Sequence, residues 1–265
     1  MEAEFSKVDI AHAKIKHLVT LYDFVADRRL QVLPGQHLNI NELSDRVRVS
    51  ATPVRQALER LHGEGLIDCI PGRGFFSKVP DATELQELYE FALLVLDRSL
   101  LAAQDVMEAG ALKAGIGVGM PPVRAPSAEE DHPRNALFIE AVSEWITGLS
   151  KNKQMLRMMK NFHDRSRYVR CLTLANCPNT SIHFTEIITL INLVRTGQTG
   201  LARSIVQTQM THEIAHLPDI IRHARTRWET PDANISPDSL RYQQATSIAL
   251  GQMAPKPVKG SFRNM

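Results

Sequence analysis

The stretch VSATPVRQALERLHGEGLIDCIPGRGFF, residues 49–76, contains the start and end of a short helix and, soon afterwards, a tight turn. Ser50 or Thr52 can cap the start of the helix, and Pro53 suits its first turn. Gly63 and Gly65 can end it. Helical spacing places a set of apolar side chains on one side, namely Val54, Leu58 and Leu61. The stretch therefore predicts an amphipathic helix with one buried face.

The segments on either side complete a small domain. After the helix, LIDCIPGRGFFSKVP (66–80) predicts two short strands around a turn at residues 71–74. Before it, NINELSDRVRVS (39–50) has Asn39 and Glu42 three residues apart, as in a capping box, and residues 10–27 have helical apolar spacing. Three helices followed by a hairpin predict a winged helix-turn-helix, whose third helix enters the major groove of DNA.

Local charge agrees with this prediction, although the whole chain has a net charge of only +2. Residues 46–78 contain six basic and three acidic residues, a local balance of +3. Arginines on the exposed side of the third helix and at a glycine turn suit contacts to phosphates and guanines.

Three motifs that follow one another in this region resemble the GntR family of bacterial transcription regulators: T-P-V-R (52–55), L-x-x-E-G-L-I (61–67) and P-G-R-G-F (71–75). The resemblance implies DNA contacts by Thr52 and Arg55 on the recognition helix and by Gly72 and Arg73 at the tip of the wing. Family members often carry arginine where this chain has Ala51, which implies one contact fewer. The candidate DNA-contacting residues are Arg46, Arg48, Ser50, Thr52, Arg55, Gly72 and Arg73. For Arg46 and Arg48 a solvated surface remains the alternative.

The rest of the chain predicts an all-helical bundle. A long helical pattern begins near Asp81, and further patterns cover residues 134–151, 153–175, 181–195 and 199–225. Residues 110–133 predict an irregular or mobile loop. Together with LVRTGQTGLARSIVQTQM (193–210), these patterns resemble the FCD domain of the FadR subfamily. The fold class is mainly α, with a DNA-binding domain at residues 1–80, an effector-binding and dimerisation bundle at 81–228 and a flexible tail at 229–265.

The resemblance also indicates what is missing from this bundle. The metal ligands of FCD domains align with Asn135, Ile139, Ile187 and Gln209, which do not form a usual ligand set, so no metal or other cofactor is expected. The arginine that often faces an acidic effector aligns with Ala92. We therefore expect either an apolar cavity for an apolar or aromatic effector, or a core plugged by side chains. The candidate effector-binding residues are Ala92, Leu96, Asn135, Ile139, Arg165, Ile187 and Gln209, with Arg167 as an alternative to Arg165.

THEIAHL, residues 211–217, contains H-E-x-x-H, in which His212 and His216 could bind zinc while Glu213 acts as general base. A peptidase would also need a third ligand and an open cleft, and no sequence signal indicates either. A metal site relocated to Asp131, His183 and His212 is the remaining metal hypothesis.

Composition limits the class of protein. The charged amino terminus and the lack of a long apolar run predict a cytoplasmic protein that does not contact a membrane, and three cysteines without a C-x-x-C pair indicate neither disulfides nor a cysteine zinc site. The overall interpretation is a homodimeric repressor that binds palindromic double-stranded operator DNA. A small-molecule effector would release it by changing how the bundle packs against the helix that begins near Asp81. The alternatives are an architectural DNA binder that needs no ligand, and an H-E-x-x-H metallopeptidase.

Overall fold

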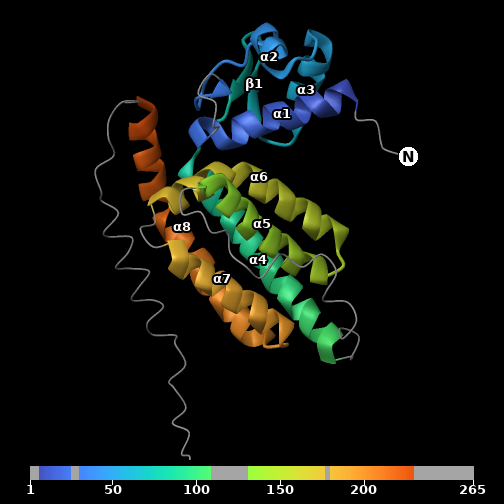
Figure 1. Ribbon diagram of the computed structural model, residues 1–265, viewed down its shortest axis with the longest axis vertical. Coiled ribbons are helices and arrows are strands. Elements are labelled where there is room, and N and C mark those ends of the chain that lie inside the picture. The colour runs from blue at the N-terminus through green and yellow to red at the C-terminus, as the bar shows by residue number, and fades with distance from the viewer. Residues whose placement is uncertain (1–5, 25–29, 109–130, 177–179, 230–265) are drawn as a thin grey trace, which may run out of the picture.

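The computed structural model describes residues 6–24, 30–108, 131–176 and 180–229 of the 265 residues. Its amino-terminal part contains α1 (Lys7–Leu21), the 3-10 helix η1 (Tyr22–Phe24), α2 (Ile40–Val47), α3 (Ala51–Gly63), β1 (Ile67–Ile70) and β2 (Gly74–Ser77). The bundle contains α4 (Ala82–Glu108), α5 (His132–Leu149), α6 (Lys153–Asn176), α7 (Thr180–Arg195) and α8 (Thr199–Glu229). Figure 1 shows α1 lying between the rest of the amino-terminal part and the bundle. The predicted winged helix-turn-helix and helical bundle are both confirmed.

The helix-turn-helix forms where the capping residues indicate. Asn39 caps α2 through its side-chain oxygen, which accepts hydrogen bonds from the backbone amides of Asn41 (2.9 Å) and Glu42 (3.2 Å). At the end of α3, Gly65 has φ +75° and lets the amide of Leu66 reach the carbonyl of Leu61 at 3.0 Å. The chain then turns directly into the antiparallel pair of β1 and β2, in which Ile67 faces Ser77 and Ile70 faces Gly74.

The first helix is shorter than predicted, because a tertiary contact competes with the helical pattern. The helix α1 ends at Leu21, and Tyr22 has φ 48°. The buried ring of Tyr22 packs edge-on against Tyr168 of α6 with the centroids 4.7 Å apart, and its hydroxyl donates to the carbonyl of Lys78 at 2.8 Å. The end of the predicted helix, residues 25–27, lies outside the described residues.

In the bundle, α4 and α8 run antiparallel as its central pair. Arg203 bonds Asp97 at 2.7 Å and Thr199 bonds Gln104 at 3.3 Å, so the start of α8 lies beside the end of α4. The buried face of α4 contains Leu85, Tyr89, Ala92 and Leu96, as predicted, while Leu88 and Leu93 are partly buried against the same core. The predicted loop and tail fall almost entirely on residues 109–130 and 230–265, outside the described part of the chain. No helix of the described residues is both long and apolar enough to cross a membrane.

The two parts of the molecule share a core. Ile15 and Leu18 of α1 belong to the same buried cluster as Leu58 of α3 and as Cys171 and Leu174 of α6. The DNA-binding part is therefore packed onto the bundle through α1.

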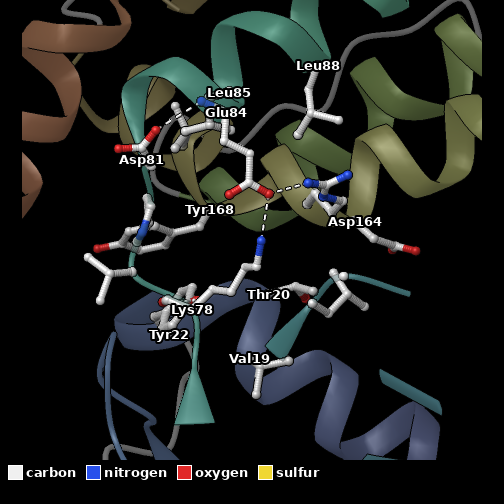
Figure 2. Close-up of a pocket in the computed structure, with 16 residues that line it drawn as sticks. Val19, Thr20, Tyr22, Lys78, Asp81, Glu84, Leu85, Leu88, Asp164 and Tyr168 are labelled. Carbon is white, nitrogen blue, oxygen red and sulfur yellow. Dashed lines mark hydrogen bonds and ion pairs between the residues drawn. The ribbon is translucent and has the colours of Figure 1, made fainter. Parts of the chain in front are cut away.

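A second contact closes the junction where β2 leads into α4. Lys78 and Glu84 both line a pocket of about 40 Å³ at this junction. Figure 2 shows the two side chains pointing toward each other. The Lys78 ammonium donates to Glu84 Oε1 at 2.6 Å, and Arg165 of α6 bonds the same oxygen. Partial burial alone would raise the pKa of Glu84, but these two hydrogen bonds outweigh it and lower the pKa. Glu84 thus ties the end of the wing to both α4 and α6.

Candidate nucleic-acid interface and bundle cavity

The first turn of α3 presents two of the predicted DNA-contacting residues to solvent. Thr52 and Arg55 are exposed, whereas the inward-facing side chains of the same helix are fully buried: Val54, Ala57, Leu58 and Leu61. Both exposed residues line a surface concavity of about 450 Å³ between α3, the start of α2 and β2. The recognition helix is therefore held by its apolar face while its polar face borders an open hollow.

The same concavity brings in residues that sequence reasoning did not single out as DNA contacts. His37 and Asn41 line it beside Arg55. Asn39 also lines it, but its side-chain oxygen already caps α2. Asn39 could be recognised from its capping position, but its proximity to α3 depends on how the two helices pack, which no local pattern encodes.

The wing places Arg73 at an exposed tip. The amide of Arg73 donates to the carbonyl of Ile70 at 2.9 Å, and Gly72 and Gly74 adopt φ +74° and +95°. The guanidinium of Arg73 lies 5.4 Å from the centroid of the Phe76 ring. A Cβ atom at residue 74 would lie 3.1 Å from His37 Nε2, so glycine there also allows a close approach between wing and helix domain.

The remaining predicted DNA contacts differ in how much of their side chain is already used. Arg46 is half-buried and bonded to Glu42 one turn earlier. Ser50 occupies the N-cap position of α3 without a side-chain capping bond, and Arg48 is exposed in the turn between α2 and α3. Among the described residues, Arg48, Arg55 and Arg73 take part in no ion pair.

Inside the bundle, four of the predicted effector-binding residues line one cavity of about 60 Å³: Leu96, Ile139, Ile187 and Gln209. Ala92 is buried in the same core without lining the cavity, and Asn135 is fully buried elsewhere on α5. Arg165 lies at the junction with Glu84, not in this cavity, because it projects from α6 toward the start of α4. The placement of Arg165 therefore corrects the prediction for that residue.

The cavity also has a charged end, which the expectation of an apolar cavity did not include. Arg170 and His163 of α6 and Glu213 of α8 line it. Arg170 forms an ion pair with Glu140 at 2.9 Å, and burial together with the nearby charge of Glu213 raises the pKa of Tyr89. The aligned metal positions pointed only to α5, α7 and α8, and the polar side chains on α6 lie outside that alignment.

His163 contributes an unusual group to this polar end. Burial, and then the charges of Arg170 and Arg167, lower the pKa of His163 well below its usual value, so the ring is neutral. The Arg170 guanidinium lies 3.5 Å from Nδ1 and can only donate, which places the ring proton on Nε2. Among the described residues Nε2 has no hydrogen-bond partner, although His163 is only 2% exposed.

The H-E-x-x-H residues do not form a zinc centre with any described neighbour. Glu213 lines the cavity, and the rings of His212 and His216 lie tilted by 39° with their centroids 4.2 Å apart. His216 Nδ1 donates to the backbone carbonyl of His212 at 2.8 Å. In the described part of the chain, no group of three His, Cys, Asp or Glu residues is suited to a metal. Of the residues of the relocated site, Asp131 caps α5, and the side chain of His183 lies outside the described part.

Comparison with known proteins supports the nucleic-acid interface. Residues 28–76 match the profile of "Bacterial regulatory proteins, gntR family". The Nta operon transcriptional regulator of Aminobacter aminovorans is 28% identical over 52% of this chain and 64% of its own length. An HTH-type transcriptional regulator in an unstable DNA locus of Streptomyces ambofaciens is 26% identical over 78% of this chain and 86% of its own length. This chain thus spans less than two thirds of the first relative and more of the second.

Solved structures show the same fold. A putative transcriptional regulator GntR from Rhodococcus sp. RHA1 superposes with a TM-score of 0.63 at 16% identity, and E. coli McbR/YncC with 0.61 at 16%. The alignments cover 81% and 82% of this chain and 99% of each of those chains. The matched family is described as bacterial regulatory proteins, and both curated relatives are described as transcriptional regulators.

The turn between α2 and α3 yields a stability prediction. Arg48 has φ 56° and ψ 47°, a left-handed conformation that glycine adopts without strain. Arg48→Gly is expected to raise the free energy of unfolding by about 1 kcal/mol, because the relieved strain exceeds the entropy that glycine adds to the unfolded chain. Urea denaturation measures this change. Arg55→Gly inside α3 is the matched control and should lower stability by a similar amount. A loss of stability in Arg48→Gly would refute the strain argument.

Proposed function

We propose that this chain, whose residues 28–76 match the GntR family of bacterial regulatory proteins, is a repressor of that family that binds palindromic operator DNA as a homodimer. The observation that carries this proposal is the exposed first turn of α3, where Thr52 and Arg55 border a hollow beside the wing. A duplex whose major groove receives α3 would meet these side chains at base edges and Arg73 at the backbone.

Within this proposal, the seven predicted residues have different roles. Arg55 reads a base, whereas Arg73 and Arg48 hold phosphates. Thr52, Ser50 and Gly72 contribute through a hydroxyl or through backbone that can approach the DNA closely. Arg46 is assigned the smallest share, because Glu42 already neutralises it. His37 and Asn41 join the set on account of their position in the hollow.

The DNA-binding proposal is tested on an operator selected by the protein from a random duplex library. Arg55→Ala should weaken specific binding by about 1 to 3 kcal/mol, and Arg73→Ala should reduce the slope of log affinity against log salt by about one. Arg195→Ala, an exposed arginine of α7, is the control and should leave binding unchanged. Wild-type affinity in the Arg55→Ala, Arg73→Ala double variant would refute the assignment.

We also propose that the bundle at residues 81–228 is an FCD-type domain that carries the dimer interface. Large apolar side chains are exposed on its central helix pair: Phe91 (40%) and Leu94 (69%) on α4 and Leu201 (58%) on α8. Phe91 and Leu94 are three residues apart and so share a helix face. A second copy that covers this face would bury them, and the resulting pair would place two recognition helices on successive half-sites.

Leu94→Glu is expected to convert the dimer into a monomer at micromolar concentration, because two buried carboxylates would oppose each other or lack partners across a symmetric interface. Light scattering measures the mass. Leu137→Glu is the matched control, since Leu137 is 51% exposed but belongs to α5 and not to this helix pair, and the change should leave the dimer intact. A wild-type protein that is monomeric both with and without operator DNA would overturn the dimer proposal.

The effector, in this proposal, is a small uncharged molecule with an apolar body and one hydrogen-bond acceptor. Ile139, Ile187 and Leu96 provide apolar walls, and the Nε2–H of His163 provides a buried donor that an acceptor oxygen would satisfy. A carboxylate fits less well, because Glu140 already neutralises Arg170 and Glu213 adds negative charge to the wall.

The same cavity should not depend on a metal, since isoleucines and Gln209 occupy the aligned ligand positions. Added zinc or a chelator is expected to change the melting temperature by less than about 1 °C and to leave operator affinity unchanged. Elemental analysis that finds a stoichiometric metal resistant to dialysis would contradict this. Loss of such a metal in His163→Phe would place it in the cavity, whereas loss in His212→Phe would support the relocated site.

A further inference from the structure

One buried carboxylate joins two arginines at the polar end of the cavity. Glu140 of α5 is only 4% exposed. Its Oε1 accepts from Arg170 Nη1 at 2.9 Å and from Arg167 Nε at 3.0 Å, and its Oε2 accepts from Arg167 Nη2 at 2.7 Å. Because Arg170 also lines the cavity, Glu140 connects the cavity wall to whatever Arg167 contacts on its other side.

Arg167 extends this contact to α1. It pairs with Asp164 at 3.2 Å and donates to the hydroxyl of Thr20 at 3.4 Å. The other oxygen of Asp164 lies 2.5 Å from the ammonium of Lys16 in α1. Ion pairs thus cross from the bundle to the helix that supports the DNA-binding domain.

Lys16 in turn reaches the end of the recognition helix. It pairs at 3.4 Å with Glu64, the C-cap residue of α3. Glu64 also lies 2.9 Å from His12 and accepts from Arg60 of α3 at 3.2 Å, while its backbone carbonyl accepts from Asn161 of α6 at 2.8 Å.

Glu64 stays ionised throughout the physiological range. Partial burial would raise its pKa, but the hydrogen bond with His12 and the charge of Lys16 outweigh burial and lower the pKa to about 2. The link to α3 is therefore ionic under all conditions in which the protein would bind DNA.

The charges along this path alternate in sign, and each carboxylate is shared by at least two basic side chains. The path from the cavity to α3 runs through Arg170, Glu140, Arg167, Asp164, Lys16 and Glu64. A shared carboxylate cannot leave one cation without changing its hold on the other, and a buried cation left alone must find a new partner. A change at one end therefore forces neighbouring pairs to rearrange.

We propose that Glu140 is a positioning residue for the recognition helix, acting through this ion-pair chain to Glu64. The proposal rests on the proposed function, since it assumes that the unliganded protein is the form that binds DNA. An effector that changed the position of Arg170 would loosen Glu140 from Arg170 and so disturb the orientation of α3 from a distance.

The test compares Glu140→Gln with Glu144→Gln in the full-length protein. Glu144 lies one turn further along α5 and forms its own ion pair with Lys160 at 3.6 Å. It does not belong to the ion-pair chain between Arg170 and Glu64. Glu140→Gln is expected to lower affinity for the selected operator about tenfold at constant salt, because the two arginines would recruit Asp164 away from Lys16. Glu144→Gln should stay within about twofold of wild type.

Lys16→Met tests the other end and serves if Glu140→Gln does not fold. Alone, Lys16→Met should also weaken operator binding. Combined with Glu140→Gln it should have little further effect, because the ion-pair chain is already interrupted. Val194 is buried in α7, a helix that contributes no residue to the ion-pair chain. Val194→Ala should therefore lower the melting temperature without changing operator affinity, which separates a positioning effect from a general loss of stability.

Two results would overturn the proposal: operator affinity within twofold of wild type in both Glu140→Gln and Lys16→Met, or full multiplication of their effects in the double variant. If Arg55→Ala weakens operator binding while both chain variants bind normally, only the ion-pair chain is refuted. If Arg55→Ala binds normally as well, the proposed function fails first.

Discussion

The packing of α1 against both α3 and α6 is the contact on which the arrangement of the whole molecule depends. Ile15 is completely buried in a cluster that contains Leu58 of the recognition helix and Leu174 of the bundle. A linker alone would leave the winged helix free to rotate relative to the bundle. The relative orientation of two recognition helices in a dimer would then be undefined. Here the apolar contacts of α1 fix the recognition helix relative to the bundle. A conformational change in the bundle would therefore reach the recognition helix through α1 or through the contacts beside it.

Apolar and ionic contacts contribute differently to this packing. Burial of Ile15, Leu18 and their neighbours supplies most of the attraction, because it scales with the apolar area removed from water. The buried ion pairs add little net stability, since desolvation cancels much of their attraction. They do restrict geometry, because a carboxylate such as Glu140 satisfies two guanidiniums only in a narrow range of positions. The packing is thus strong through its apolar part and directional through its charged part.

Local signals in the sequence were sufficient for most of the fold. The capping residue Asn39, the glycine at residue 65 and the apolar spacing of α3 predict elements that form with those boundaries, because caps and spacing act within one or two turns. The predicted end of the first helix was wrong, because Tyr22 leaves the helical conformation and contacts Tyr168 and Lys78, both distant in sequence. The charged end of the cavity was missed for a related reason. His163, Arg167 and Arg170 follow helical spacing on α6, so their common face was readable, but that this face meets Glu140 is a property of the packed bundle.

The number of exposed arginines without an ion pair on the proposed DNA-contacting surface sets how strongly such a protein would be attracted to DNA of any sequence. Among the described residues, Arg48, Arg55 and Arg73 are exposed on this surface and form no ion pair, so two protomers would bring these six arginines to a duplex. Since only Arg48 and Arg73 are assigned to phosphates, two protomers would displace counterions from about four phosphates, which corresponds to a salt slope of roughly −4, smaller in magnitude than that of strongly basic repressors. Such a protein would be held weakly by random chromosomal DNA. It would spend little time sliding along the chromosome and reach its target mainly by repeated three-dimensional encounters.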